Sequence, residues 1–197
     1  MRLSFPDLNI LQPVIPEANS MSKQNEVVVS EVCDGALSAD DLNQLAEMLD
    51  QAVAQGASIG FIPPFGHQQA LAFWLKLIPA FTSGERRLLV ARLNGKIIGT
   101  VQLAVSQPAN GIHRADVNKL MVHPDARRLG IARSLMVAIE LVARSAGKTL
   151  LVLDTISGGA AESLYTSLGY EISGRIPAYA MSTDGELEPT TVMYKIL

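Results

Sequence analysis

The chain alternates short, continuously apolar stretches with amphipathic ones, and this pattern predicts a mixed α/β fold. Runs of β-branched and aliphatic residues bounded by Gly, Pro or Asn are typical of strands, whereas apolar positions three and four apart are typical of helices. The predicted order is strand, helix, helix, three strands, helix, strand, helix and two strands. Strands are expected at 26–32, 87–93, 96–105, 113–122, 149–153, 170–176 and 190–197, and helices at 38–56, 68–81, 130–146 and 160–168.

The strand–helix–strand order over residues 113–153 sets the predicted topology, because such a unit forms a right-handed parallel crossover. The run 149–153 (TLLVL) is apolar throughout, as expected of a strand buried on both faces. Asn94–Gly95 is a hairpin turn signal. We therefore expect an α/β (α+β) fold with a mixed, mostly antiparallel twisted sheet of about seven strands and about four flanking helices. We expect the fourth and fifth strands to be the one parallel pair, the parallel seam of the sheet, and ligands often bind at the carboxyl ends of such strands.

Composition supports one folded domain over residues 26–197, preceded by an N-terminal extension, 1–25. Of the 197 residues, 48% are hydrophobic and 18% are charged, which is enough apolar surface for a core. The first twenty residues do not resemble a secretory signal, because Asp7 and three prolines interrupt their apolar stretch. Two interpretations of this extension stay open: a disordered arm, or a segment preceding a later translation start at Met21.

Charge and residue counts exclude several classes of function. A net charge of −3 argues against nucleic-acid binding as the main function. The single cysteine, Cys33, excludes an internal disulfide and a cysteine-based zinc site, and the three histidines lack metal-ligand spacing, so no metal is expected. No apolar run reaches the roughly 18 residues of a membrane span. We expect a soluble cytoplasmic protein.

The stretch 127–132 (RRLGIA) lies between a predicted strand end and a predicted helix start. A helix N-terminus carries backbone N–H groups without internal partners and a partial positive charge. Gly130 would let an anion approach these groups closely, and Arg127, Arg128 and Arg133 add formal charge. The same residues could form a basic helix start with a glycine in its turn. Their position between LMVHP and a buried strand favours a pyrophosphate site.

Three sequence motifs, in this order along the chain, indicate a family resemblance: LMVHP at 120–124, RRLGIA at 127–132 and LYTSLGY at 164–170. From about residue 85 to the C-terminus the chain resembles the GNAT family of acetyl-CoA-dependent N-acetyltransferases. More narrowly, GASIGF, NGIHRADVNKLMVHPDARRLGIARSLM and IPAYAMSTDGELEPT are similar to the tabtoxin-resistance acetyltransferases, which modify a small β-lactam amino-acid toxin.

The resemblance implies the GNAT fold, acetyl-CoA as cosubstrate and a small-molecule amine as acceptor. Members are often dimers, so a homodimer is one expected assembly. Together with the predicted helix start, it assigns cofactor binding to Leu120, Met121, Val122, Arg127, Arg128, Leu129, Gly130, Ile131, Ala132, Arg133 and Ser134.

Acetyl transfer to an amine needs a group that accepts the amine proton and a group that protonates the departing thiolate. Asp154 ends an otherwise uncharged strand, which is typical of a site carboxylate, although it could instead cap the following turn. The resemblance makes Asp116, on the fourth strand, a second candidate base, whose alternative is a solvated strand face. The two carboxylates could share the work.

The resemblance makes Tyr165 the general acid, the alternative being a core aromatic packed with neighbouring leucines. Many members carry an asparagine seven residues before this tyrosine, where this chain has Gly158. The apolar loop 57–66, either a lid or a core plug, and the stretch 179–189 would flank the acceptor.

These features predict an N-acetyltransferase that transfers the acetyl group directly in a ternary complex. Cys33 is far from the motifs, which gives no support to an acyl-enzyme. Two alternatives remain: a protein or peptide N-acetyltransferase, and a non-catalytic acetyl-CoA sensor. The apolar loop 57–66 disfavours an open peptide groove, and the presence of both aspartates with Tyr165 disfavours a sensor.

Overall fold

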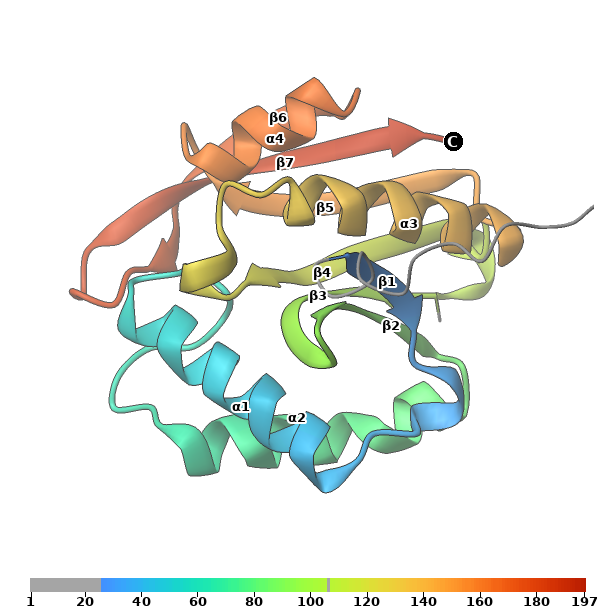
Figure 1. Cartoon of the computed structure of the whole chain (residues 1–197). Helices are drawn as coiled ribbons and strands as arrows, with labels where there is room; N and C mark the ends of the chain where they lie inside the picture. The colour runs from blue at the N-terminus through green and yellow to red at the C-terminus, as the bar shows by residue number, and fades with distance from the viewer. Residues whose placement is uncertain (1–25, 106) are drawn as a thin grey trace, which may run out of the picture.

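A seven-stranded sheet runs through the computed structural model, which describes residues 26–105 and 107–197 (Figure 1). The predicted extension 1–25 lies outside the described residues. The strands are β1 (Val27–Glu31), β2 (Arg86–Leu93), β3 (Lys96–Ala104), β4 (Arg114–Val122), β5 (Leu150–Ile156), β6 (Glu171–Met181) and β7 (Leu187–Ile196). The helices are α1 (Ala39–Ala54), α2 (His67–Thr82), α3 (Ile131–Ser145) and α4 (Ala160–Ser167).

The strands lie in the order β1-β2-β3-β4-β5-β7-β6. Neighbouring strands pair antiparallel except β4 and β5, which are parallel and joined through α3. The predicted fold class is therefore confirmed, including the position of its one parallel seam.

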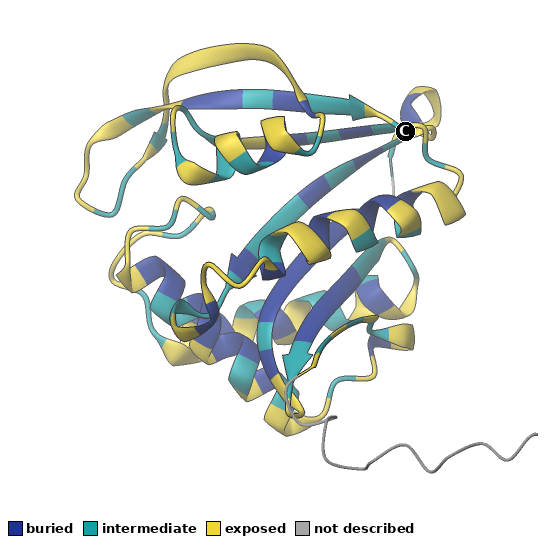
Figure 2. Ribbon diagram, turned by 45° about the horizontal axis from the view of Figure 1, so that its top comes forward, coloured by how far each residue is buried: buried dark blue, intermediate teal, exposed yellow. Residues whose placement is uncertain are grey.

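Helices cover the sheet on both faces, with α1 and α2 on one side and α3 and α4 on the other (Figure 1). In β2, Leu89 and Ala91 belong to the apolar cluster under α3, whereas Leu88 and Val90 belong to the cluster under α1 and α2. Because both faces of β2 are buried, its sequence is apolar without alternation. The strands between the helices are buried, whereas β6 at the sheet edge is exposed (Figure 2).

Local sequence signals explain where the first two helices begin and how they pack. Ser38 precedes α1, and its hydroxyl accepts a hydrogen bond from the backbone N–H of Asp41 (3.0 Å). The side chain of Trp74 in α2 is fully buried, and its indole N–H donates to the carbonyl of Leu45 in α1 (3.0 Å). These two helices thus form one packed layer.

The strands after α3 are longer than predicted. β5 continues to Ile156, so Asp154 lies inside the strand and not, as was predicted, at its end. β6 continues to Met181, and β7 begins at Leu187. The reason is pairing: residues 150–156 of β5 all have partners in β7, so the ladder extends strands whose polar residues and prolines suggested loops.

The loop 57–66 packs partly into the core, as one of its two predicted roles requires. Its side chains Ile59, Phe61 and Phe65 are partly buried against the α1–α2 cluster, with the Phe61 ring 5.1 Å from that of Phe73 in α2. Residues 57–60, Ile59 included, also line a cavity. None of the described helices is long and apolar enough to span a membrane.

Candidate active site

The parallel strands β4 and β5 separate soon after they begin. Their pairing covers residues 114–116 opposite 150–152, although β4 continues to Val122 and β5 to Ile156. Beyond Asp116, therefore, the facing edges of the two strands present backbone groups without a partner in the described ladder. A cavity in such a place is typical of ligand sites in sheets with a parallel crossover.

A β-bulge in β4 lies beside this opening. Gln102 of β3 pairs with Asn118 and Thr100 pairs with Met121, so Lys119 and Leu120 together oppose one residue of β3. The backbone of Lys119 is left-handed, with a φ of 51°. Bulges redirect side chains and are common beside active sites. Lys119 was missed by sequence reasoning, because a single lysine in a strand carries no motif.

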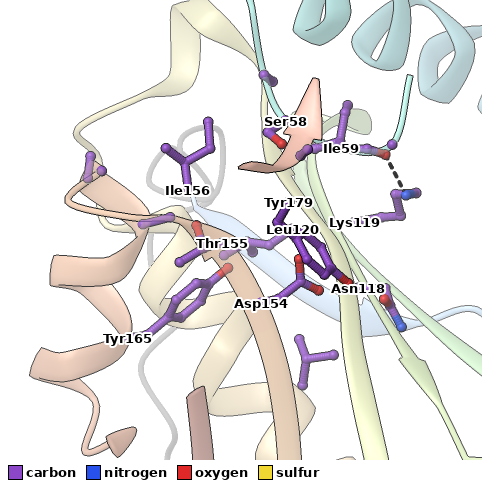
Figure 3. A pocket seen from close by; sticks show the side chains of 17 residues that line it. Ser58, Ile59, Asn118, Lys119, Leu120, Asp154, Thr155, Ile156, Tyr165 and Tyr179 are labelled. Carbon is purple, nitrogen blue, oxygen red and sulfur yellow. Dashed lines mark hydrogen bonds between the residues drawn. The ribbon is translucent and has the colours of Figure 1, made fainter. Parts of the chain in front are cut away.

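The opening contains a cavity of about 450 Å³, drawn in Figure 3. Its wall combines β4, β5, the start of α4, the loop 57–60 and the end of β6. Asp154 and Tyr165 both line it, and their polar groups point toward the same space. The two segments expected to flank the acceptor, 57–66 and 179–189, both contribute to the lining.

Tyr165 extends from α4 into this cavity from the core. Its side chain is buried and its ring centroid lies 5.8 Å from that of Tyr170. Burial, and secondly the charge of Asp154, raise the pKa of Tyr165 to about 12. The phenol therefore keeps its proton at neutral pH and can donate it.

Asp116 lies outside the lining of this cavity. Its carboxylate accepts a hydrogen bond from the side-chain amide of Gln107 (2.7 Å), and the guanidinium of Arg114 lies 3.9 Å away. Of the two predicted carboxylates, the structure thus brings Asp154 together with Tyr165 and leaves Asp116 engaged by its own neighbours.

A second cavity, of about 480 Å³, lies at the N-terminus of α3. The cap residue Gly130 has a φ of 77°, and no side chain caps the helix. Its first turn therefore carries free backbone N–H groups. A Cβ added to Gly130 would meet nothing within 4 Å, so the space beside these groups is open.

Nine of the eleven predicted cofactor-binding residues line this second cavity: Leu120, Met121, Val122, Arg127, Arg128, Gly130, Ile131, Ala132 and Arg133. Leu129 and Ser134 do not. The side chain of Leu129 is exposed, and the hydroxyl of Ser134 donates to the carbonyl of Gly130 (3.3 Å). The first and second cavities share five lining residues, Ala57, Ile59, Leu120, Ala160 and Ala161, so they adjoin.

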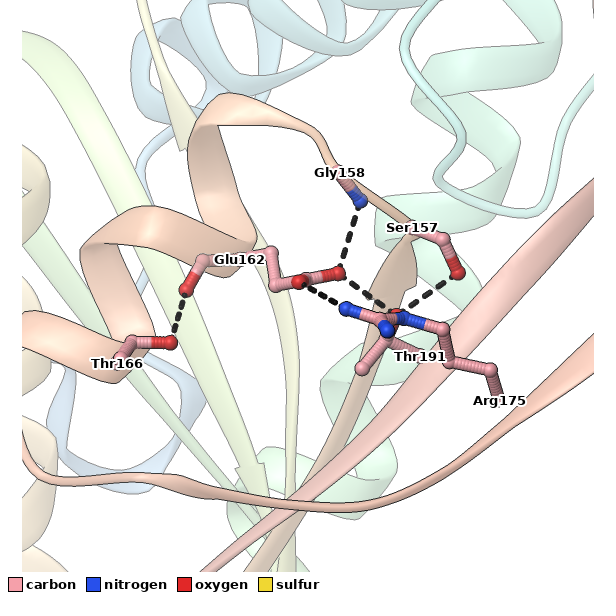
Figure 4. Close-up of polar contacts among 6 residues, drawn as sticks. All are labelled: Ser157, Gly158, Glu162, Thr166, Arg175 and Thr191. Carbon is pink, nitrogen blue, oxygen red and sulfur yellow. Dashed lines mark hydrogen bonds and ion pairs between the residues drawn. The ribbon is translucent and has the colours of Figure 1, made fainter.

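A polar network holds the start of α4, the helix that carries Tyr165 (Figure 4). The carboxylate of Glu162 accepts hydrogen bonds from the Gly158 backbone N–H (2.8 Å), the Thr191 hydroxyl (2.7 Å) and the Arg175 guanidinium (2.8 Å). These bonds, that of Gly158 first, lower the pKa of Glu162 to about 2. At Gly158, where the family pattern has an asparagine, the backbone N–H is therefore engaged by Glu162. Sequence reasoning missed Glu162, because two of its three partners, Arg175 and Thr191, lie on β6 and β7.

No group of three or more His, Cys, Asp or Glu side chains suited to a metal ion occurs among residues 26–105 and 107–197.

Comparisons with known proteins agree with this architecture. A family model described as an acetyltransferase (GNAT) domain matches residues 84–172. Over 124 residues the chain is 36% identical to an uncharacterized N-acetyltransferase of the hisH–hisA intergenic region of Azospirillum brasilense, covering 60% of this chain and 70% of that protein.

Solved structures share the fold. A ribosomal-protein-alanine N-acetyltransferase from Brucella melitensis superposes with a TM-score of 0.71 at 23% identity, covering 86% of this chain and 99% of that one. The protein yncA from Salmonella typhimurium, solved with its cofactor acetyl-CoA, superposes with a TM-score of 0.70 at 21% identity, covering 87% and 94%. At these identities the likeness establishes the fold alone.

Proposed function

We propose that this chain, which belongs to the GNAT family of acetyltransferases and acts with acetyl-CoA, transfers the acetyl group directly to the amine of a small molecule. The observation that carries the proposal is the junction of two cavities. One begins at an uncapped helix N-terminus, and the other contains a carboxylate and a buried tyrosine. Groups suited to phosphate binding and to proton transfer thus lie in two adjoining cavities.

The residues around the second cavity fit coenzyme A. The free N–H groups after Gly130, together with Arg127 and Arg128, suit the negative charge of a pyrophosphate. The unpaired edges of β4 and β5 suit an extended arm with amide groups, which could bond to them as an added strand would. When bound, acetyl-CoA supplies the acetyl group as a thioester.

Asp154 and Tyr165 divide the proton transfers in this proposal. Asp154 accepts a proton from the acceptor amine, directly or through a water molecule, which leaves the amine nucleophilic. Tyr165 donates its phenolic proton to the departing thiolate sulfur. Its pKa of about 12 keeps that proton available over the whole neutral range. Asp116 has a lesser role, because Gln107 and Arg114 already engage its carboxylate.

Direct transfer agrees with the position of Cys33. This side chain is exposed and lines a separate concavity with residues of β1 and α2, so it is not placed to form an acyl-enzyme. The size of the first cavity, about 450 Å³, is in the range of small-molecule sites. Within this class, the similarity to tabtoxin-resistance acetyltransferases favours an amino-acid-like or toxin-like amine.

A third cavity favours one alternative, acetylation of a protein or peptide. It has a volume of about 330 Å³, lies between residues 56–62 and 180–183, and adjoins the first cavity. A peptide could leave the site along it. Mass spectrometry of cellular proteins with and without the enzyme would separate this alternative from a small-molecule acceptor.

The direct test is release of free thiol from acetyl-CoA over a panel of amines and amino acids. With a responsive amine, Tyr165→Phe should lower kcat by about 10²–10⁴-fold, the usual contribution of a general acid, and Asp154→Asn should lower it comparably. Tyr194→Phe is the matched control, because that hydroxyl bonds to Glu171 outside the cavity. Unchanged rates in both site variants would contradict the assigned roles. Binding of acetyl-CoA without turnover on any amine would favour the sensor alternative.

A further inference from the structure

Lys119 occupies an unusual position for a lysine in a strand. Its left-handed backbone, with a φ of 51°, lies at the bulge of β4, and its side chain lines the cavity that contains Asp154 and Tyr165. Non-glycine residues in this conformation cost free energy and cluster at functional sites. The backbone at Lys119 thus adopts an unfavourable conformation at the point where its side chain lines this cavity.

The ammonium group keeps hydrogen-bonding capacity. One N–H donates to the carbonyl of Ile59 at 2.6 Å (Figure 3). Nζ also lies over the rings of Phe61 and Phe73, 5.3 and 5.8 Å from their centroids, which is within the range of a cation–π interaction but uses no hydrogen-bond acceptor. An ammonium has three donors, so two remain. Lys119 belongs to none of the ion pairs among the described residues.

The charge on Lys119 is also incompletely solvated. Burial is the first cause that lowers the pKa of Lys119, the Arg86 cation is the second, and Asp154 opposes both. Among the residues that line the first cavity, Lys119 is the one cation and Asp154 the one anion. A bound molecule therefore meets a positive group on β4 and a negative group on β5.

We propose that Lys119 binds a carboxylate of the acceptor while Asp154 faces its amine, so that the acceptor is an amino acid or another amine with a free carboxylate. The inference rests on the proposed function and narrows its substrate class. Lys119 acts as a specificity-determining residue: its two remaining N–H groups donate to the carboxylate oxygens, and the ion pair forms in a partly desolvated cavity.

A carboxylate fits this site better than a phosphate. One cation balances the single charge of a carboxylate, whereas a phosphate dianion would leave excess negative charge in a cavity that already contains Asp154. A zwitterionic acceptor is neutral overall and matches the two opposite charges of the cavity.

The test compares matched acceptors. Initial rates of acetyl-CoA-dependent acetylation are measured for L-α-amino acids, β-alanine and 4-aminobutyrate, each paired with its carboxamide. The wild-type protein should prefer the acid over its carboxamide by roughly ten- to a hundredfold in kcat/KM, as expected for a charge-assisted hydrogen bond. Lys119→Met should reduce that ratio to near one through a higher KM for the acid, and Lys119→Arg should retain much of it.

Lys96→Met removes the same charge from the exposed β2–β3 turn and should keep the wild-type ratio. A second readout is calorimetric binding of the N-acetylated acid, with coenzyme A present, which should weaken by the same factor in Lys119→Met. If Lys119→Met instead weakens acid and carboxamide equally, the residue only holds the loop through Ile59, and the inference is wrong. Acetylation confined to amines without a carboxylate would overturn this inference alone. If no amine is acetylated, the proposed function fails, and this inference with it.

Discussion

The N-termini of α1 and α3 are built in opposite ways. At α1 the Ser38 hydroxyl accepts from the Asp41 N–H at 3.0 Å, and the Asp41 carboxylate accepts from the Ser38 N–H at 3.2 Å. At α3 the cap is Gly130, which has a left-handed backbone and no side chain that could bond to the free N–H groups. Both helices have the same peptide dipole and the same orphan donors. Of the two helices, only α1 has a side chain that accepts a hydrogen bond from a free backbone N–H of its first turn.

The surroundings explain the difference. The first turn of α1 contains Asp40 and Asp41, which complement the helix dipole, whereas that of α3 contains no acidic residue and follows Arg127 and Arg128. Of these two helix starts, only that of α3 lines a large cavity. An open, cation-flanked helix start leaves its donors for an external anion, whereas a capped one contributes to the stability of the fold.

Among variants of the helix starts, the largest expected effect comes from closing the open start of α3. Gly130→Asp places a carboxylate beside the free N–H groups, where it both caps them and repels phosphate. The Kd for acetyl-CoA, measured by calorimetry, should rise by about a hundredfold, the equivalent of one or two lost charge-assisted hydrogen bonds. Strain should be moderate, because Asp tolerates a left-handed backbone and the space around Gly130 is open.

Gly147→Asp is the matched control. Gly147 follows the C-terminus of α3, has a φ of 71° and also has no atom within 4 Å of an added Cβ. The substitution therefore carries similar backbone strain, and it should leave the Kd for acetyl-CoA unchanged. Equal affinity in the two variants would show that the N-terminus of α3 does not bind the pyrophosphate.

A smaller effect, on stability and not on binding, is expected at the capped start. Ser38→Ala removes the acceptor for the Asp41 N–H and should lower the free energy of unfolding by about 1 kcal/mol. Denaturant unfolding measures this change, and the Kd for acetyl-CoA should stay at its wild-type value. A loss of affinity in this variant would contradict the distinction between the two helices.

The smallest effect concerns a third helix start, that of α4, which the Glu162 carboxylate ties to β6 and β7. The pKa of Glu162 is lowered from 4.5 to about 2 in the folded protein. The stability that the Glu162 carboxylate contributes is therefore complete above about pH 4.5 and is lost as the pH falls toward 2. In urea unfolding between pH 6 and pH 3, the wild-type protein should lose stability more steeply than Glu162→Gln. Equal slopes would mean that the carboxylate titrates normally in the folded protein.

Much of the fold was predictable, because its signals are local. The hairpin turn at Asn94–Gly95, the cap at Ser38 and the apolar strand 149–153 each fixed one element to within a few residues. The ends of β5, β6 and β7 were not predictable, because their polar residues form strands only through pairing with one another. Local propensity contains no information on such a partner.

The residues of the candidate site also fall into two groups, those with a local sequence signal and those placed by contacts between distant segments. The uncapped start of α3 was predictable from RRLGIA, since a glycine at a helix N-terminus depends only on adjacent residues. Lys119 was not, because the bulge that turns it into the cavity is a mismatch in register between β3 and β4. Glu162 was not, because its partners Arg175 and Thr191 lie 13 and 29 residues away along the chain, on β6 and β7.

The order of helices and strands, the single crossover and the glycine at the start of α3 are thus properties of the sequence by itself, since each depends on residues within one helical turn or one strand. The tertiary structure alone decided that Asp154, and not Asp116, shares a cavity with Tyr165, and that Lys119 lines the same cavity. The physical reason is that β4 and β5 diverge after three paired residues. The direction of a side chain in that opening depends on how neighbouring strands pair, which no short stretch of sequence specifies.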